Sequence, residues 1–137
     1  MDDKKENILL SLSRERANEG QLGAQLYMAQ AYLNGDGVDQ DYVESAYWME
    51  KAANQGHEGA CHNVAIFYEN GLGVEKDMHK AIKWYRRAAR KGFSNSQRAL
   101  GRIYKDSNRK EAVKWLKMAA NQNDEQAITM LKEIEGA

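Results

Sequence analysis

The chain contains no proline and only one cysteine among its 137 residues. Without proline, no helix interior is interrupted, and turns must be built from Gly, Asn, Asp or Ser. The single Cys61 excludes an internal disulfide framework and fits a reducing compartment. No apolar run is long enough to cross a bilayer, and the short run Ile8 to Leu10 does not form a signal peptide. We therefore expect a cytoplasmic protein, one domain in length, that can bury a core.

The chain also lacks net charge, but its charges are unevenly distributed. Residues 1–50 have ten acidic and four basic residues, whereas residues 80–117 have thirteen Lys or Arg and only two acids. Such a charge dipole can steer an acidic partner toward the C-terminal half. The alternative interpretation is that these charges are the solvated faces of helices.

What the chain does contain is an internal repeat at a fixed offset of 36 residues. A period of this length is typical of repeat proteins, whose units each lack a complete core and stack on their neighbours. The first copy contains Gly23-Ala24, Tyr32, Gly35, Gly37-Val38, Asp41, Trp48, Lys51-Ala52-Ala53 and Gly56, and the second contains Gly59-Ala60, Tyr68, Gly71, Gly73-Val74, Asp77, Trp84, Arg87-Ala88-Ala89 and Gly92.

Each unit is predicted to be a helical hairpin. In the first copy, apolar residues at helical spacing predict helices near 22–34 and 42–55. Gly35 can end the first helix in the left-handed conformation, and Asp41 with Glu44 forms the pattern of a capping box at the start of the second.

The third copy is shortened, and both ends of the chain look like half-units. Five residues are missing from the third loop, where Asn108 with Glu111 can still cap a helix, and Asn123 takes the place of the repeated glycine. Terminal half-units can cover the open ends of a repeat array. We predict an all-α single repeat domain over 1–137 without strands, with about seven antiparallel helices: a capping helix in 1–20 (near 6–18), repeats at 22–57, 58–93 and 94–123, and a capping helix in 124–137 (near 124–135).

The repeated string A-x3-[L/V/M]-[G/A]-x2-Y-x2-G-x-G-V-x2-D-x3-A-x2-W-Y-x-[K/R]-A-A-x2-G resembles the SEL-1-like repeat, a relative of the tetratricopeptide repeat, over residues 22–123. Ser45, Met49, Ala29 and Ala65 depart from the family pattern. The resemblance implies a right-handed α/α superhelical solenoid that acts as an adaptor or scaffold. Members occur in bacterial signalling and host-interaction proteins and in eukaryotic protein quality control.

The resemblance also implies that the first helix of each hairpin lines a concave groove. Apolar Leu26, Leu33 and Ile66 would contact a partner there, asparagine amides would hold its backbone, and basic residues would suit a carboxylate or phosphate. We hypothesise that the groove binds an extended segment or helix of another protein with an acidic end; alternatively, these residues pack between helices or face water. The candidate groove residues are Leu26, Gln30, Leu33, Asn34, His62, Asn63, Ile66, Glu69, Asn70, Arg98, Arg102, Lys105, Thr129 and Met130, with Glu133 beside them.

No residue set in the sequence predicts catalysis, a cofactor or a metal. His57, Cys61 and His62 offer too few ligands for structural zinc and lack the orienting group that a cysteine nucleophile needs. The Gly-x-Gly pairs follow helices rather than strands, so we interpret them as turns and not as phosphate-binding loops. We therefore expect a protein without enzymatic activity.

Two alternative functions remain open from the sequence. A small, unadorned repeat array suits an inhibitor or immunity-type protein that occludes a partner enzyme. The basic stretch 80–117 suits an anionic surface or nucleic acid, although the sequence pI of about 6.8 and the acidic N-terminal third argue against nucleic acid.

Overall fold

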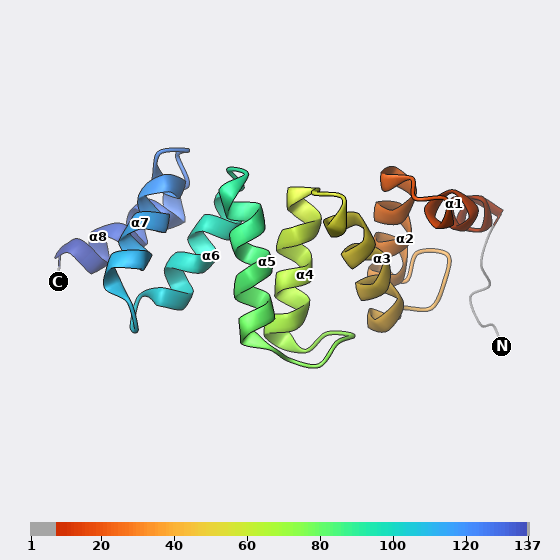
Figure 1. The fold of residues 1–137 in the computed structure, drawn as a ribbon, viewed down its shortest axis with the longest axis horizontal. Coiled ribbons are helices and arrows are strands. Elements are labelled where there is room, and N and C mark those ends of the chain that lie inside the picture. The colour runs from red at the N-terminus through yellow and green to blue at the C-terminus, as the bar shows by residue number, and fades with distance from the viewer. Residues whose placement is uncertain (1–7, 137) are drawn as a thin grey trace. The chain divides into compact units, whose positions relative to one another are not determined.

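A computed structural model describes residues 8–136, and these residues form helices joined by turns, with no strand among them. Figure 1 shows the helices following one another as antiparallel hairpins. Over this range there are eight helices where about seven were expected; the expected elements, two capping helices and three repeats of two helices each, themselves add up to eight, so the expected number was one too low. They are α1 (Ile8–Asn18), α2 (Leu22–Asn34), α3 (Tyr42–Asn54), α4 (Glu58–Asn70), α5 (Met78–Arg90), α6 (Ser94–Tyr104), α7 (Arg109–Ala120) and α8 (Glu125–Gly136).

The residues that end and begin the helices act largely as predicted. Gly35 ends α2 with φ 74°, and its N–H donates to the carbonyl of Ala31. Asp41 accepts from the backbone N–H groups of Val43 and Glu44 at 3.0 and 3.2 Å, so it caps α3. The other half of the predicted capping box is replaced: the N–H of Asp41 donates to the Tyr32 carbonyl at 2.9 Å, because the loop folds back onto the end of α2.

The third repeat also turns with the residues that were predicted for it. Asn108 caps α7 by accepting from the Glu111 N–H at 3.2 Å. Asn123 has φ 66° and is the one non-glycine residue with positive φ in the range 8–136. Asparagine therefore replaces glycine in the left-handed region at this turn.

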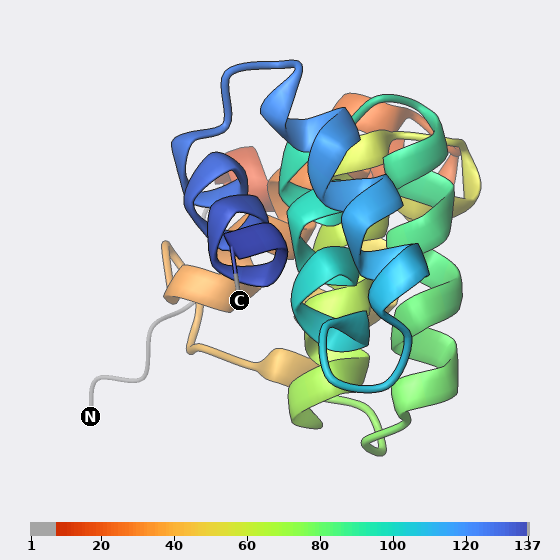
Figure 2. The ribbon, with the colours of Figure 1, turned by 90° about the vertical axis from the view of Figure 1, so that its left-hand side faces the viewer.

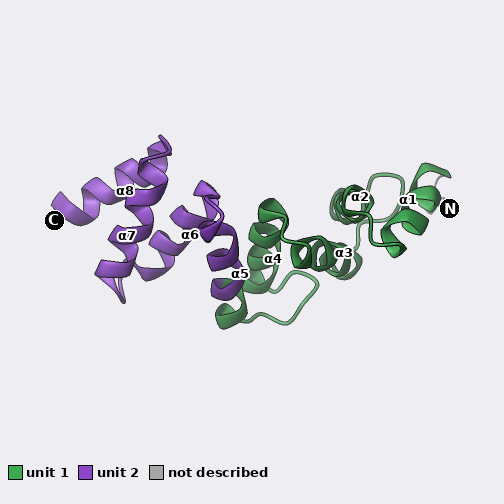
Figure 3. Cartoon of the chain, turned by 45° about the horizontal axis from the view of Figure 1, so that its top comes forward, with its two compact units in different colours: residues 1–81 green, residues 82–137 purple. Residues whose placement is uncertain are grey.

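The chain divides into two compact units, residues 1–81 and 82–137, and the division falls within α5 (Figure 3). Unit 1 contains α1 to α4 and the first residues of α5, and unit 2 contains the rest of α5 with α6 to α8.

The core of unit 1 consists of small residues at the helix crossings with a few large side chains between them. Ala29, Ala52 and Ala60 are fully buried, and Met28 and Met49 fill the volume beside them. Small residues let the helix backbones approach closely, and large side chains then complete the dense packing. The predicted repeat core is thus confirmed in this unit.

Ser45, one of the departures from the family pattern, is fully buried in unit 1. Its Oγ donates a hydrogen bond of 2.7 Å to the backbone carbonyl of Ala29, which joins α3 to α2. A buried hydroxyl needs such a partner to avoid a desolvation penalty. The serine therefore adds a polar link between the two helices of the first hairpin.

The core of unit 2 lies between α6, α7 and α8, the last two of which Figure 2 shows beside each other. Leu100, Trp115 and Leu116 are buried there, and Ala127 of α8 packs with Leu116. Gly101 is also buried, and a Cβ atom at this position would overlap the side chain of Leu116. The absence of a side chain at 101 therefore sets how closely α6 and α7 approach.

Glutamine side chains form equivalent hydrogen bonds in the first and third repeats. Gln25 donates to the Ala17 carbonyl at 3.2 Å and accepts from Gln55 at 2.8 Å. Gln97, two repeat periods later, donates to the Ala89 carbonyl at 3.1 Å and accepts from Gln122 at 3.0 Å. In the second repeat the corresponding residue is Cys61, whose Sγ lies 3.5 Å from the Ala53 carbonyl. Cys61 is therefore a buried packing residue.

Candidate functional site

Nine of the fourteen predicted groove residues lie in unit 1, on α2 and α4. On α2, Leu26 and Leu33 are half-buried, and Gln30 and Asn34 are exposed. The apolar residues are thus partly used by the core, while the two amide side chains face solvent. This arrangement leaves a mixed apolar and polar surface on α2.

The α4 residues are less open than those of α2. His62, Asn63, Ile66 and Glu69 are half-buried, and only Asn70 is exposed. The Asn63 amide lies 3.9 Å from the Met49 sulfur, and the Asn70 amide donates to the Ile66 carbonyl at 3.1 Å. Both asparagines therefore have some of their hydrogen-bonding capacity satisfied within unit 1. We call the nine residues on α2 and α4 the first-helix face.

The remaining five residues lie in unit 2, where the structure gives Arg98 an internal partner. Arg98 forms a short ion pair with Asp124, which also caps α8 by accepting from the Ala127 N–H at 2.9 Å. A guanidinium neutralised in this way links α6 to the start of α8. Arg102 and Lys105 are exposed at the end of α6. In unit 2 these two are therefore the candidate basic residues that face solvent.

The two predicted α8 residues differ in burial. Met130 is half-buried and packs against the cluster of Leu116, Ala119 and Ala127. Thr129 is exposed and lies beside Glu125 and Gln126 in a shallow hollow along α8. The structure therefore gives Met130 a packing role within unit 2.

A tyrosine recurs at 36-residue spacing and contacts the residue 18 positions before it in every repeat. Arg14 donates to the Tyr32 hydroxyl at 2.6 Å, and Arg86 donates to the Tyr104 hydroxyl at 2.9 Å. In the second repeat the contact is reversed, because the Tyr68 hydroxyl donates to a carboxylate oxygen of Glu50 at 3.1 Å. The sequence analysis identified the tyrosines as packing groups but missed these polar partners, although they recur with the same period.

The Tyr68 contact has an electrostatic consequence. Burial raises the pKa of the Tyr68 hydroxyl above its usual value of 10.0, and the negative charge of Glu50 and its hydrogen bond raise it further. Lys80 lies 5.3 Å from the centre of the same ring. Tyr68 therefore stays protonated as a donor to Glu50 through the neutral pH range.

Sequence reasoning also missed a pocket in unit 1 that none of the predicted groove residues lines. It has a volume of about 360 Å³ and lies between α3 and the loop that follows α4. We call it the α3 pocket; its lining residues are Val43, Ala46, Tyr47, Glu50, Lys51, Asn54, Gly73 and Val74. Three large apolar residues exposed on α3, Tyr42, Val43 and Tyr47, are the sequence signal that could have indicated it.

The residues considered for metal or nucleophilic chemistry have structural roles. His57 caps α4, because its Nδ1 accepts from the Ala60 N–H at 3.0 Å. Cys61 is buried. Within residues 8–136, no three His, Cys, Asp or Glu side chains are grouped so that they could hold a metal ion. In the same range, no helix combines the length and apolar character needed to cross a membrane.

Comparison with protein families assigns this architecture. The Sel1 repeat model matches residues 22–57, 59–93 and 94–124, which is most of the chain. The chain belongs to the Sel1 repeat family. The match places all three hairpins of the structure, including the shortened third, within consecutive Sel1 repeats. Repeat domains of this kind generally mediate protein interactions and are typically non-catalytic.

Solved structures of bacterial proteins show the same fold. A protective antigen present in uropathogenic Escherichia coli strains, which displays an SLR fold, matches with a TM-score of 0.83 and 33% identity, over 91% of this chain and 28% of that one. A Sel1 repeat protein from Oxalobacter formigenes matches with a TM-score of 0.76 and 32% identity, over 82% of this chain and 47% of that one. The Sel1 chain thus spans less than half of either relative.

A third structure shares the fold alone. Cysteine rich protein B of Helicobacter pylori matches with a TM-score of 0.69 and 21% identity, over 89% of this chain and 94% of that one. Unlike that cysteine-rich protein, the Sel1 chain has a single cysteine. No curated protein matches the sequence.

Proposed function

We propose that this Sel1 repeat protein is a non-enzymatic adaptor that binds a segment of a partner protein on its first helices. The observation that supports the proposal is the first-helix face of unit 1. There the half-buried Leu26 and Leu33 lie on α2 with the exposed amides of Gln30 and Asn34, and the half-buried Ile66 lies on α4 with the exposed amide of Asn70. Half-buried apolar residues can desolvate a partner side chain, and exposed amides can pair with its backbone.

In unit 2, the same proposal assigns an acidic end of the partner to Arg102 and Lys105. Arg98 is excluded from this role because it is neutralised by Asp124. Two exposed basic residues favour a carboxylate or phosphate mainly by steering its approach, so their effect is expected to depend on salt.

Site-specific photo-crosslinking tests the proposal. A photoreactive amino acid at Gln30 or Asn34 on α2 should crosslink in cells to a protein other than this chain itself, whereas one at Lys51 or Asn54 on α3 should not crosslink to that protein. All four positions are exposed and lie on helices of unit 1. Burial of the photoreactive side chain therefore does not explain a difference in crosslinking between the two helices. Equal crosslinking from both helices, or crosslinking from α3 alone, would contradict binding on the first helices.

The alternative of an anionic surface or nucleic acid is less well supported. Several basic residues of the 80–117 stretch already have partners: Arg86 contacts Glu111 at 3.4 Å, Arg98 pairs with Asp124, and Arg87 lies 4.6 Å from the centre of the Trp84 ring. Fewer unpaired charges release fewer counterions on binding a polyanion. Weak retention on heparin at physiological salt is the expected result. The cytoplasmic location also stays a prediction, which cell fractionation can check.

A further inference from the structure

The α3 pocket lies on a surface that the proposed partner site does not use. Its helix carries three large apolar residues in solvent: Tyr42 is 40% exposed, Val43 63% and Tyr47 52%. Exposed apolar residues gathered beside a pocket mark an interaction site more often than scattered ones do. The volume of about 360 Å³ lies at the lower end of the range for small-ligand pockets and can admit a long side chain.

The far wall of the α3 pocket depends on backbone packing. Gly73 has φ 69°, and a Cβ atom there would overlap the carbonyl group of Tyr42. The loop therefore touches the first turn of α3 through its backbone, and Gly73 and Val74 form a wall facing Val43 and Tyr47. A wall held in this way keeps the pocket open without a bound partner.

The α3 pocket belongs to an acidic segment of the chain. Residues 36–77 contain nine Asp or Glu and two Lys, and of these charged residues Glu50 and Lys51 line the pocket. Unit 1 as a whole has fourteen acidic and seven basic residues, a formal charge of −7. The occupant of the α3 pocket is therefore expected to present an apolar side chain among basic residues.

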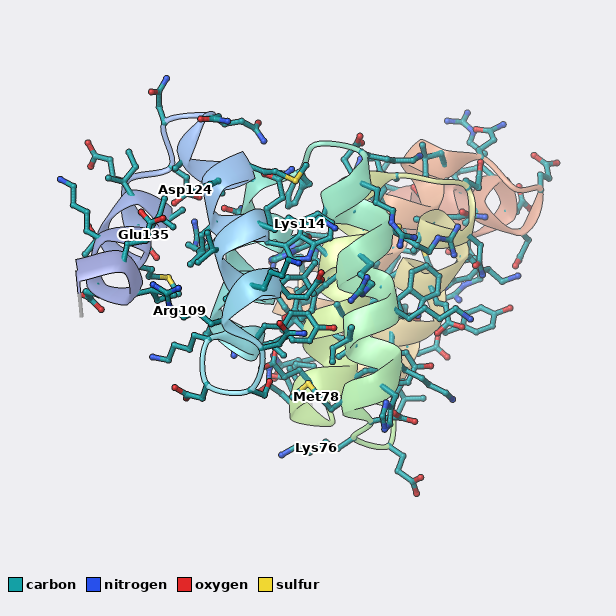
Figure 4. The ribbon with its side chains drawn as sticks, turned by 60° about the vertical axis from the view of Figure 1, so that its left-hand side comes forward. Lys76, Met78, Arg109, Lys114, Asp124 and Glu135 are labelled. Carbon is teal, nitrogen blue, oxygen red and sulfur yellow. The ribbon has the colours of Figure 1, made fainter. Side chains whose placement is uncertain are left out.

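Unit 2 carries a surface with this chemistry. It has thirteen basic and six acidic residues, a formal charge of +7. On α7, Met118 is 38% exposed, Lys114 lies four residues before it on the same side of the helix, and Lys117 directly precedes it in the sequence. Figure 4 shows Lys114 on this helix.

The two lysines are held only loosely within unit 2. Lys114 lies 4.0 Å from Glu111 and 4.9 Å from the centre of the Trp115 ring. Lys117 lies 4.0 Å from Glu135, and both side chains of that pair are exposed. Exposed pairs of this length contribute little to stability, so both lysines can turn toward another acidic surface.

We propose that the α3 pocket binds a second copy of this chain, through Met118 and the neighbouring lysines of its α7. The opposite formal charges of the two units identify the occupant, because each copy provides both an acidic receptor surface and a basic donor surface. The contact is heterologous, so copies join head to tail instead of forming a closed two-fold dimer. It uses α3 and α7 and leaves the first-helix face available for another protein.

Sedimentation velocity over a concentration series is the first test. The wild-type protein should associate beyond a dimer, and raising NaCl from about 0.1 M to about 1 M, which shortens the screening length from roughly 10 Å to roughly 3 Å, should weaken association by about tenfold or more. A wild-type protein that stays monomeric at concentrations up to about 1 mM, or that forms a closed dimer insensitive to salt, overturns the proposal.

A complementation experiment tests the two surfaces. Val43→Lys with Tyr47→Lys removes the receptor surface on α3 and leaves α7 intact. Lys114→Glu with Met118→Glu removes the donor surface on α7 and leaves α3 intact. Each double variant alone should be monomeric, whereas an equimolar mixture should form a 1:1 dimer that grows no further. A mixture that stays monomeric, or a variant that still associates alone, contradicts the assignment.

Matched controls separate the contact from general charge effects. Gln30→Lys with Asn34→Lys changes the charge of α2 as the first variant changes that of α3, and Thr129→Glu with Lys132→Glu matches the second on α8. Both controls should associate like the wild type. Equal loss in a control would show that net charge, and not the proposed surfaces, governs association. Far-ultraviolet circular dichroism confirms that each variant is folded.

Discussion

The packing of the loop after α4 onto α3 yields a sharp prediction about Gly73. Replacing Gly73 by alanine imposes two separate costs. A left-handed φ of 69° costs a side chain roughly 1–2 kcal/mol. The added Cβ atom also overlaps the backbone of Tyr42 and Val43, which cannot move aside as a flexible side chain would, and such overpacking costs roughly 1–3 kcal/mol. Gly73→Ala should therefore destabilise unit 1 by about 2–5 kcal/mol.

Two glycines of the same unit separate these costs. Gly71 also has positive φ, but its Cβ atom would make only ordinary contacts with Lys76, so Gly71→Ala should cost about 1–2 kcal/mol. Gly23 lies in α2 with nothing within 4 Å of its Cβ position, so Gly23→Ala should stabilise by about 0.5–1 kcal/mol. Urea denaturation followed by far-ultraviolet circular dichroism measures all three. If Gly73→Ala costs no more than Gly71→Ala, the close approach of loop and helix is refuted.

Three further changes test the contacts within the units. Gly101→Ala should destabilise unit 2 by about 1–3 kcal/mol in urea denaturation, because its Cβ atom overlaps Leu116, and an unchanged midpoint would contradict the close crossing of α6 and α7. Ser45→Ala should cost about 0.5–1.5 kcal/mol for the lost hydrogen bond, and a stabilised variant would show that the hydroxyl is only tolerated. The folded protein raises the pKa of Tyr68. The stabilisation that the protonated Tyr68 hydroxyl gives the folded state is therefore fully present below the unfolded pKa of 10.0 and is lost as the pH rises through the folded pKa. Wild-type stability should thus fall more steeply above pH 10.0 than that of Tyr68→Phe, and parallel pH profiles in thermal unfolding would contradict this.

Local features of the fold could be predicted because their signals lie within a few residues of the structures they cause. The helix 22–34 begins and ends where the periodicity and Gly35 predicted, and Asp41 caps the next helix. Because the sequence repeats every 36 residues, the same helices and turns could be predicted at the corresponding positions of the later repeats. Asn123 shows the same kind of signal, since a residue that tolerates positive φ stands where the period places a glycine.

The candidate site was harder to predict because its chemistry depends on contacts between distant residues. The ion pair of Arg98 with Asp124 joins residues 26 apart, so sequence spacing could not show that this guanidinium is occupied. Met130 was assigned to the groove by position, but tertiary packing directs it toward Leu116. The α3 pocket exists because a loop packs against a helix of the preceding hairpin, which no local pattern encodes.

Hydrogen–deuterium exchange of the protein with its captured partner tests the central claim most directly. If the partner binds on the first helices, added protection should concentrate in α2 and α4, with amide exchange in α3 unchanged at a matched monomeric concentration. Protection confined to α3 and α7, with α2 and α4 exchanging as in the free protein, would contradict the account.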